Sequence, residues 1–138
     1  MAISSVVDKT CGQIRTTVTG PVTVKEILDH LATAQREQLL PLSEFIDARQ
    51  AAPPYLSADD LWTAAGSVRA TKLAQPLGPR AVVVNNSTMF GLVRIFATLV
   101  SGYFPISVFR NEKTAMEWLS SHPQFHRAIQ PPPTTESP

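Results

Sequence analysis

Short β-branched runs alternate with apolar stripes of helical spacing along this chain. Two such runs come first, ISSVV (3–7) and IRTTVTG (14–20), and the turn-rich segment DKTCGQ between them predicts a β-hairpin. In the second run, Ile14, Thr16 and Val18 alternate with more hydrophilic positions. This period of two predicts a strand with one buried face and one face exposed to water.

A helix over residues 23–36 is predicted to follow the hairpin. Thr23 and Glu26 have the T-x-x-E spacing of a capping box, in which each side chain satisfies a free backbone N–H. Apolar residues then recur at positions 24, 27, 28 and 31, which places one stripe against a core. We expect His30 on the wetter side of this helix, next to Asp29.

Three strand–helix pairs are predicted in the rest of the chain. The strands cover 43–48, 80–86 and 106–110; the paired helices begin at Ser57, cover 88–101, and begin after Asn111. This order predicts an α/β fold with a mixed, mostly parallel sheet of four to five strands, an N-terminal hairpin and flanking helices. We expect residues 1–122 to form a single domain and the Pro-rich segment 123–138 to be a disordered C-terminal tail.

Composition narrows the classes of partner. The formal net charge is +1, from 12 basic and 11 acidic residues, so nothing points to a nucleic-acid partner. Cys11 is the sole cysteine and has no disulfide partner in the chain, which is typical of a reducing compartment. The N-terminus lacks the pattern of a signal peptide, and the longest apolar helix is too short to span a bilayer. These features predict a cytoplasmic protein without membrane insertion.

Four segments carry a family resemblance. They are the hairpin running into Gly20-Pro21, the strand with Asp47-Ala48-Arg49, the RAVVV strand (80–84) followed by MFGLVRIF (89–96), and VFRNEKTAMEWL (108–119). In these segments the chain resembles the SpoIIAA-like branch of the STAS superfamily, the anti-sigma-factor-antagonist fold. The last segment is similar to the family's Phe-Arg-x-x-x-x-Ala-x-x-Trp-Leu ending. The resemblance implies a small single-domain fold in which helices flank a mixed sheet.

The resemblance also implies a range of functions. Relatives in the superfamily include phospho-regulated switch proteins and, more distantly by fold, carriers of apolar ligands of the CRAL-TRIO type. The switch proteins carry a phosphorylatable Ser or Thr in an Asp-Ser-Ser-Gly or Asp-Thr-Ser-Gly turn. This chain has Asp47-Ala48-Arg49-Gln50 at that position, without a hydroxyl or a glycine. The resemblance therefore does not imply a phospho-switch role for this chain.

Asp47 and Arg49 are candidate ligand-binding residues. Open α/β sheets bind their ligands beyond the carboxyl ends of the strands, and Asp47 and Arg49 lie at the predicted carboxyl end of the strand 43–48. The alternative is a structural role, in which the Asp47 carboxylate caps a loop or a nearby helix N-terminus while Arg49 points to solvent.

The polar turn between the strand 80–86 and the following helix is a second candidate site, formed by Asn85, Asn86, Ser87 and Thr88. A helix N-terminus presents free N–H groups and a positive dipole end to an anion. However, the turn has no glycine that would let a phosphate approach the backbone closely. Capping of the helix by Asn86 or Ser87 explains the same composition.

The predicted helix 88–101 is more apolar than a helix with a single buried face needs to be. Its candidate interface or cavity residues are Met89, Phe90, Val93, Phe96, Leu99 and Val100. A narrow polar edge remains at Ser87, Gly91, Arg94, Thr98 and Ser101. Such a helix needs a second cover besides its own sheet. That cover is a neighbouring helix of the chain, a second copy in a homodimer, another protein, or a small apolar ligand.

No catalytic constellation is found in the sequence. His30, His122 and His126 show no metal-ligand spacing with Cys11 or with paired acids, so we expect no metal and no cofactor. The leading hypothesis is a non-enzymatic protein-interaction or regulatory domain. The alternative is a carrier or sensor of a small apolar or lipid-like ligand. An enzyme would need polar groups converging around Asp47, Asn85 and Arg94.

Overall fold

The computed structural model describes residues 3–8, 10–52, 57–70 and 77–122. In chain order the elements are β1 (Ile3–Asp8), β2 (Gln13–Pro21), α1 (Val24–Arg36), β3 (Ser43–Ala52), α2 (Ala58–Ala70), β4 (Arg80–Val83), α3 (Ser87–Leu99), β5 (Ile106–Phe109) and α4 (Glu112–Ser120). The predicted tail, 123–138, lies outside the described residues.

The strands form one five-stranded sheet in the order β1-β2-β3-β4-β5. The hairpin pair β1–β2 is antiparallel, with Ile3 opposite Val18 and Val7 opposite Ile14, and the other three pairs are parallel. The predicted α/β class with a mixed, mostly parallel sheet is therefore confirmed. Each parallel pair is connected through a helix, as parallel strands require.

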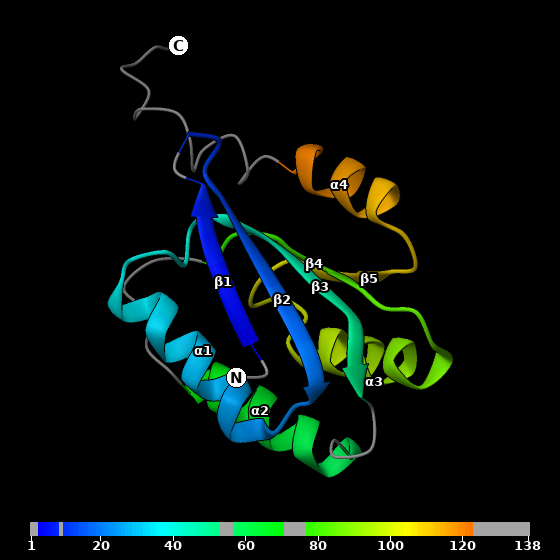
Figure 1. The fold of residues 1–138 in the computed structure, drawn as a ribbon. Coiled ribbons are helices and arrows are strands. Elements are labelled where there is room, and N and C mark those ends of the chain that lie inside the picture. Colours follow the sequence, from blue (N-terminus) through cyan, green and yellow to red (C-terminus); the bar gives the residue numbers. More distant parts are fainter. Residues whose placement is uncertain (1–2, 9, 53–56, 71–76, 123–138) are drawn as a thin grey trace.

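The helices cover the two faces of the sheet unequally. Figure 1 shows α1, α2 and α3 on one face and α4 alone on the other. The larger core lies under the three helices and includes Val18, Val82 and Met89. A smaller core lies under α4, where Phe45 packs against Leu119. Because β-strand side chains alternate between faces, β3 presents Glu44, Ile46 and Ala48 to the larger core and Phe45 to the smaller one.

The predicted capping signals are all used. Thr23 and Glu26 form the complete capping box of α1, and Asn111 accepts a hydrogen bond from the Thr114 N–H at the start of α4. Asn86, rather than Ser87, is the N-cap of α3, since its side chain accepts from the Met89 N–H at 2.8 Å.

Two predicted strand boundaries are wrong. β3 continues to Ala52 rather than ending at Ala48, because its last residues pair with the end of β2 from Thr19 to Pro21. β4 ends at Val83 rather than at 86, because Asn85 and Asn86 leave the sheet to begin α3.

Candidate functional site

Three ionisable side chains meet inside the larger core, beneath α1. Glu44 on β3 is almost fully buried, and its Oε1 lies 3.3 Å from Arg80 Nε on β4. Its Oε2 lies 2.7 Å from Nε2 of His30 on α1. The side chains of Arg80 and Glu44 are only 6% and 4% exposed. We call Glu44, Arg80 and His30 the inner cluster.

A chain of hydroxyl groups connects the inner cluster to β1. Thr16 Oγ1 on β2 donates to Glu44 Oε2 at 2.5 Å, and Ser5 Oγ on β1 lies 2.8 Å from Thr16 Oγ1. The hairpin register places Ser5 directly opposite Thr16. The two hydroxyls therefore share one face of the hairpin, the face that α1 covers.

Arg80 is held by backbone as well as by Glu44. Its Nη1 donates to three carbonyl oxygens, those of Leu40, Leu42 and Gly78, at 2.8–3.1 Å. Gly78 is needed at this approach, because a Cβ there would collide with the carbonyl oxygens of Pro41 and Leu42. The guanidinium thus joins the segment after α1 to the segment before β4.

The surroundings shift the proton affinities of the inner cluster. The hydrogen bond to Glu44 raises the pKa of His30, although partial burial opposes the effect. Burial alone would raise the pKa of Glu44, but the hydrogen bond from His30 and the charge of Arg80 together hold that pKa below its usual value. Burial lowers the pKa of Arg80, and the Glu44 carboxylate opposes this shift. Glu44 is therefore ionised at neutral pH.

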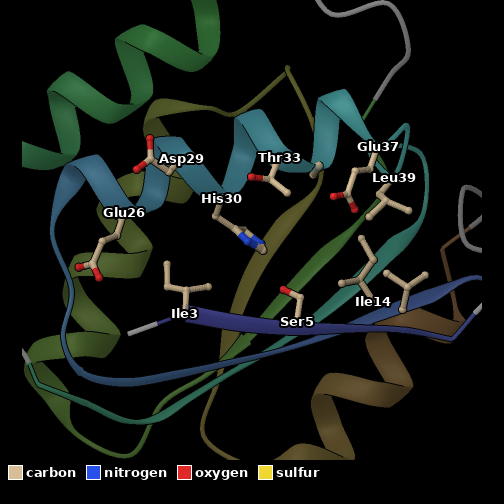
Figure 2. A pocket seen from close by; sticks show the side chains of 11 residues that line it. Ile3, Ser5, Ile14, Glu26, Asp29, His30, Thr33, Glu37 and Leu39 are labelled. Carbon is tan, nitrogen blue, oxygen red and sulfur yellow. The ribbon is translucent and has the colours of Figure 1, made fainter. Parts of the chain in front are cut away.

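His30 also lines two adjoining cavities. A cavity of about 390 Å³ lies between α1 and β1, with Ser5, Thr33, Ala34 and Glu37 among its lining residues. Figure 2 shows the imidazole pointing from α1 into this space, toward Ser5. A second cavity of about 160 Å³ lies between the sheet and the helices, and its exposed lining is entirely apolar. Ile3 and His30 line both cavities, which places the two side by side.

The predicted candidates Asp47 and Arg49 lie elsewhere, on the α4 side of β3. Arg49 donates to the Asp47 carboxylate through Nε at 2.9 Å and Nη2 at 2.8 Å. Arg49 and Arg15 also lie 3.6 and 3.4 Å from Glu112 at the start of α4. We call Asp47, Arg49, Arg15 and Glu112 the outer cluster. The structure brings the two predicted residues together, but they lie within β3 rather than at its end, and their charges are paired with each other.

The predicted polar turn provides the start of α3. Asn85, Ser87 and Thr88 are exposed, and the Asn86 side chain is engaged in capping. Among the described residues, no ion pair joins the turn or the outer cluster to the inner cluster. Ligand binding at Asn85, Asn86, Ser87 and Thr88, or at Asp47 and Arg49, stays a prediction.

The chain itself supplies part of the second cover of α3, although Ile95 on the same helix is exposed. Met89 and Val93 pack toward the sheet, whereas Phe96 and Leu99 pack against a cluster that includes Ala65 and Val68 of α2. The Arg110 guanidinium lies over the Phe90 ring, 4.5 Å from the centre of that ring. Val100 is fully buried. The predicted polar edge of α3 is exposed as expected. A homodimer or protein interface on this helix stays a prediction.

The inner cluster is the part of the site that sequence reasoning missed. The expectation that His30 lies on the wetter side of α1 is wrong, because its side chain is only 26% exposed. The signals were present in the spacing. His30 is three residues after Ile27 and four before Ala34, which puts all three on one helical face. Glu44 is two residues before Ile46, so it shares the core face of its strand.

Within the described ranges, neither a metal-binding group of side chains nor a membrane-spanning helix is present. No group of three or more His, Cys, Asp or Glu side chains is arranged to hold a metal ion there. None of the helices in that part of the chain has the length and apolarity to cross a membrane.

Comparisons with known proteins address the fold. No family model matches the chain, and no curated protein matches its sequence. A solved structure is similar, that of an uncharacterised DUF3478-family protein with a SpoIIAA-like fold from Shewanella loihica PV-4. The similarity has a TM-score of 0.56 and covers 86% of this chain and 94% of that chain, at 14% sequence identity. The SpoIIAA-like fold expected from the sequence is thus shown, and at this identity the likeness concerns the fold alone.

Proposed function

We propose that this chain is a non-enzymatic regulatory domain of the cytoplasm that binds a small amphipathic molecule in the two cavities bordered by His30. The observation that carries the proposal is the position of His30. It joins a buried charge cluster to a cavity with a mixed lining, next to a second cavity with an apolar one. A ligand with a polar head and an aliphatic body matches this division.

The cost of the inner cluster supports a role beyond folding. Removing charges such as those of Glu44 and Arg80 from water is expensive, and replacing a buried ion pair by apolar residues is often neutral or stabilising. The position of this cluster beside a cavity is better explained if its polar groups also bind a ligand, since ionisable groups with shifted pKa values beside a cleft mark candidate sites.

The size of the cavities supports the same conclusion. Sites for small molecules occupy about 300–1,000 Å³, with a mostly apolar lining and a few placed polar groups. The larger cavity, at about 390 Å³, lies within this range, and the polar groups around it include Ser5, His30 and Thr33. The packing of α3 against α2 and the sheet makes α3 a weaker candidate for the main interaction surface.

The first experiment asks whether the cavity binds an uncharged amphipathic probe. N-phenyl-1-naphthylamine, whose fluorescence rises in apolar surroundings, is titrated into the protein. We expect saturable binding that Thr33→Phe abolishes, because Thr33 lines the larger cavity and a phenyl ring would fill it. Ala32→Phe is the matched control, because Ala32 is an exposed neighbour on the same helix.

Native mass spectrometry of the protein purified from cells complements the titration. Added mass that disappears in Thr33→Phe but persists in Ala32→Phe would support the proposal. A clean mass for the wild-type chain, together with no saturable probe binding, would overturn it. Equal loss of probe binding in both variants would also count against the cavity as the site.

A further inference from the structure

We propose that the head group bound between α1 and β1 is a protonated aliphatic amine, and that protonation of His30 releases it. This inference rests on the proposed function, since it names the ligand class of the same cavity. It follows from the direction of the hydrogen bonds in the inner cluster and from the charges around the cavity mouth.

The hydroxyl chain leaves Ser5 as a hydrogen-bond acceptor. Glu44 is ionised and only accepts, so the single hydroxyl proton of Thr16 is directed to Glu44. The bond between Ser5 and Thr16 must then be donated by Ser5. With its proton committed, Ser5 Oγ presents only lone pairs to the cavity that it lines.

His30 is fixed in the same way. Its Nε2 faces the Glu44 carboxylate, so Nε2 carries a proton in both charge states of the ring. The other nitrogen, Nδ1, has no partner among the described residues. In neutral His30, Nδ1 is therefore a free acceptor. Because Ser5 and neutral His30 are both acceptors, they favour a ligand with a group that donates hydrogen bonds, such as an ammonium or a hydroxyl.

The charges at the cavity mouth favour the ammonium. Glu26 and Asp29 of α1 and Glu37, the residue after it, line the larger cavity, and none of the described lining residues is a lysine or an arginine. Asp29 is paired with Lys25 at 2.8 Å, and Glu26 is occupied by the capping box at Thr23. Glu37 has no ion-pair partner among the described residues. A cation gains from this field, whereas a carboxylate is repelled by it.

Protonation of His30 reverses the preference. Nδ1 then becomes a donor, and the ring places a positive charge beside the ammonium head. The charged groups that act on His30 from the sheet are Glu44 and Arg80, and Glu26, Asp29 and Glu37 share its cavity from α1 and the residue that follows it. β1 and α2 contribute only uncharged lining, as with Ser5 and Leu61.

The experiment compares three ligands that share an eight-carbon chain: octylamine, octanol and octanoate. Each displaces N-phenyl-1-naphthylamine from the protein at about pH 9, because alkaline pH favours the neutral form of His30 while an alkylamine (pKa about 10.4, as for Lys) is still mostly protonated. We expect octylamine to bind about tenfold more tightly than octanol, because hydrogen bonds to charged groups are the stronger ones. Octanoate should bind most weakly.

Ser5→Ala and Ser4→Ala test the acceptor. Ser5→Ala should weaken octylamine binding about tenfold, because the ammonium loses an acceptor in the cavity. Ser4→Ala is the matched control, because Ser4 is exposed on the opposite face of β1, opposite Thr17.

His30→Gln tests the release mechanism. A glutamine amide can donate to Glu44 and accept from the ligand, but it does not titrate. Wild-type affinity for octylamine should fall about tenfold between about pH 9 and about pH 6, and the affinity of His30→Gln should change little.

The outcomes separate this inference from the proposed function. Probe binding with a preference for octanoate or octanol, or octylamine binding that strengthens on acidification, overturns the inference and leaves the proposed function standing. Equal effects of Ser5→Ala and Ser4→Ala overturn it as well. Failure of the probe and all three octyl compounds to bind overturns both.

Discussion

Two clusters of charged side chains lie on opposite faces of the same sheet. The inner cluster, Glu44, Arg80 and His30, lies beneath α1, and the outer cluster, Asp47, Arg49, Arg15 and Glu112, lies beside α4. Glu44 and Asp47 are three residues apart on β3, and both accept hydrogen bonds from basic side chains. The distances are also similar, 2.7 Å for His30–Glu44 and 2.8 Å for Arg49–Asp47.

The clusters differ in their access to water. The Arg49 and Asp47 side chains are 39% and 28% exposed, against 6% and 4% for Arg80 and Glu44. Water competes for and screens the outer pairs, so such pairs contribute little. In the inner cluster Glu44 and Arg80 depend on their protein partners, because their burial limits the access of water. Proximity alone therefore does not measure the importance of an ion pair in this fold.

The largest expected effect is that of removing Arg80. In Arg80→Met, Glu44 stays buried without the guanidinium beside it, and the carbonyls of Leu40, Leu42 and Gly78 lose a donor. We expect the free energy of unfolding to fall by about 3–5 kcal/mol, measured by urea denaturation. Arg49→Gln in the outer cluster is the control and should cost less than about 1 kcal/mol. Similar losses in the two variants would contradict the distinction between the clusters.

A smaller effect is expected from the hydroxyl that connects Glu44 to Ser5. Thr16→Val keeps the shape of a buried side chain but removes the donor to Glu44, so we expect a loss of about 1–3 kcal/mol. Thr17→Val, the next residue on the exposed face of β2, should change stability by no more than about 0.5 kcal/mol. A neutral Thr16→Val would show that Glu44 does not depend on this hydrogen bond.

The smallest expected effect is a pH dependence that separates the clusters. The pKa of His30 is raised in the folded chain, so its stabilisation is complete below its usual pKa of 6.5 and is lost as the pH rises through the folded value. The melting temperature should therefore decline by a few degrees on the alkaline side. His30→Gln should remove this decline.

The acidic side of the same profile reports on the carboxylates of both clusters. The pKa of Asp47 is lowered by its hydrogen bonds with Arg49, and the pKa of Glu44 is lowered as described above. Their stabilisation is present above the usual pKa values of 3.8 and 4.5 and is lost as the pH falls through the folded values. Asp47→Asn should flatten part of the acidic side and leave the alkaline decline intact. An alkaline decline that persists in His30→Gln would assign it to another group.

Local signals predicted most of the fold. The hairpin, the capping box at Thr23 and the Asn111 cap depend on neighbours within a few residues, and all are found as expected. The boundary errors at β3 and β4 have a different origin, since strand ends depend on pairing with segments far away in the chain. Local propensity carries no information about that pairing.

The candidate site was predicted less well, for a related reason. Asp47 and Arg49 are candidates in the sequence because the predicted strand ends at Ala48, yet pairing with β2 extends β3 to Ala52. His30 and Glu44 are 14 residues apart, and Arg80 follows 36 residues after Glu44, so no local motif contains the inner cluster. The spacing predicts on which face of its helix or strand each residue lies, but it does not predict which residue becomes its partner.

By itself, the sequence determined the elements, their order and the face of each strand and helix that carries apolar residues, because these follow from local backbone preferences and side-chain periodicity. Tertiary structure decided which polar residues meet and which of them lose water. It set α1 against the hairpin and brought Arg80 beneath it, so that His30, Glu44 and Arg80 share one interior. It also left the adjoining cavity unfilled, because side-chain packing depends on volumes contributed by several distant segments.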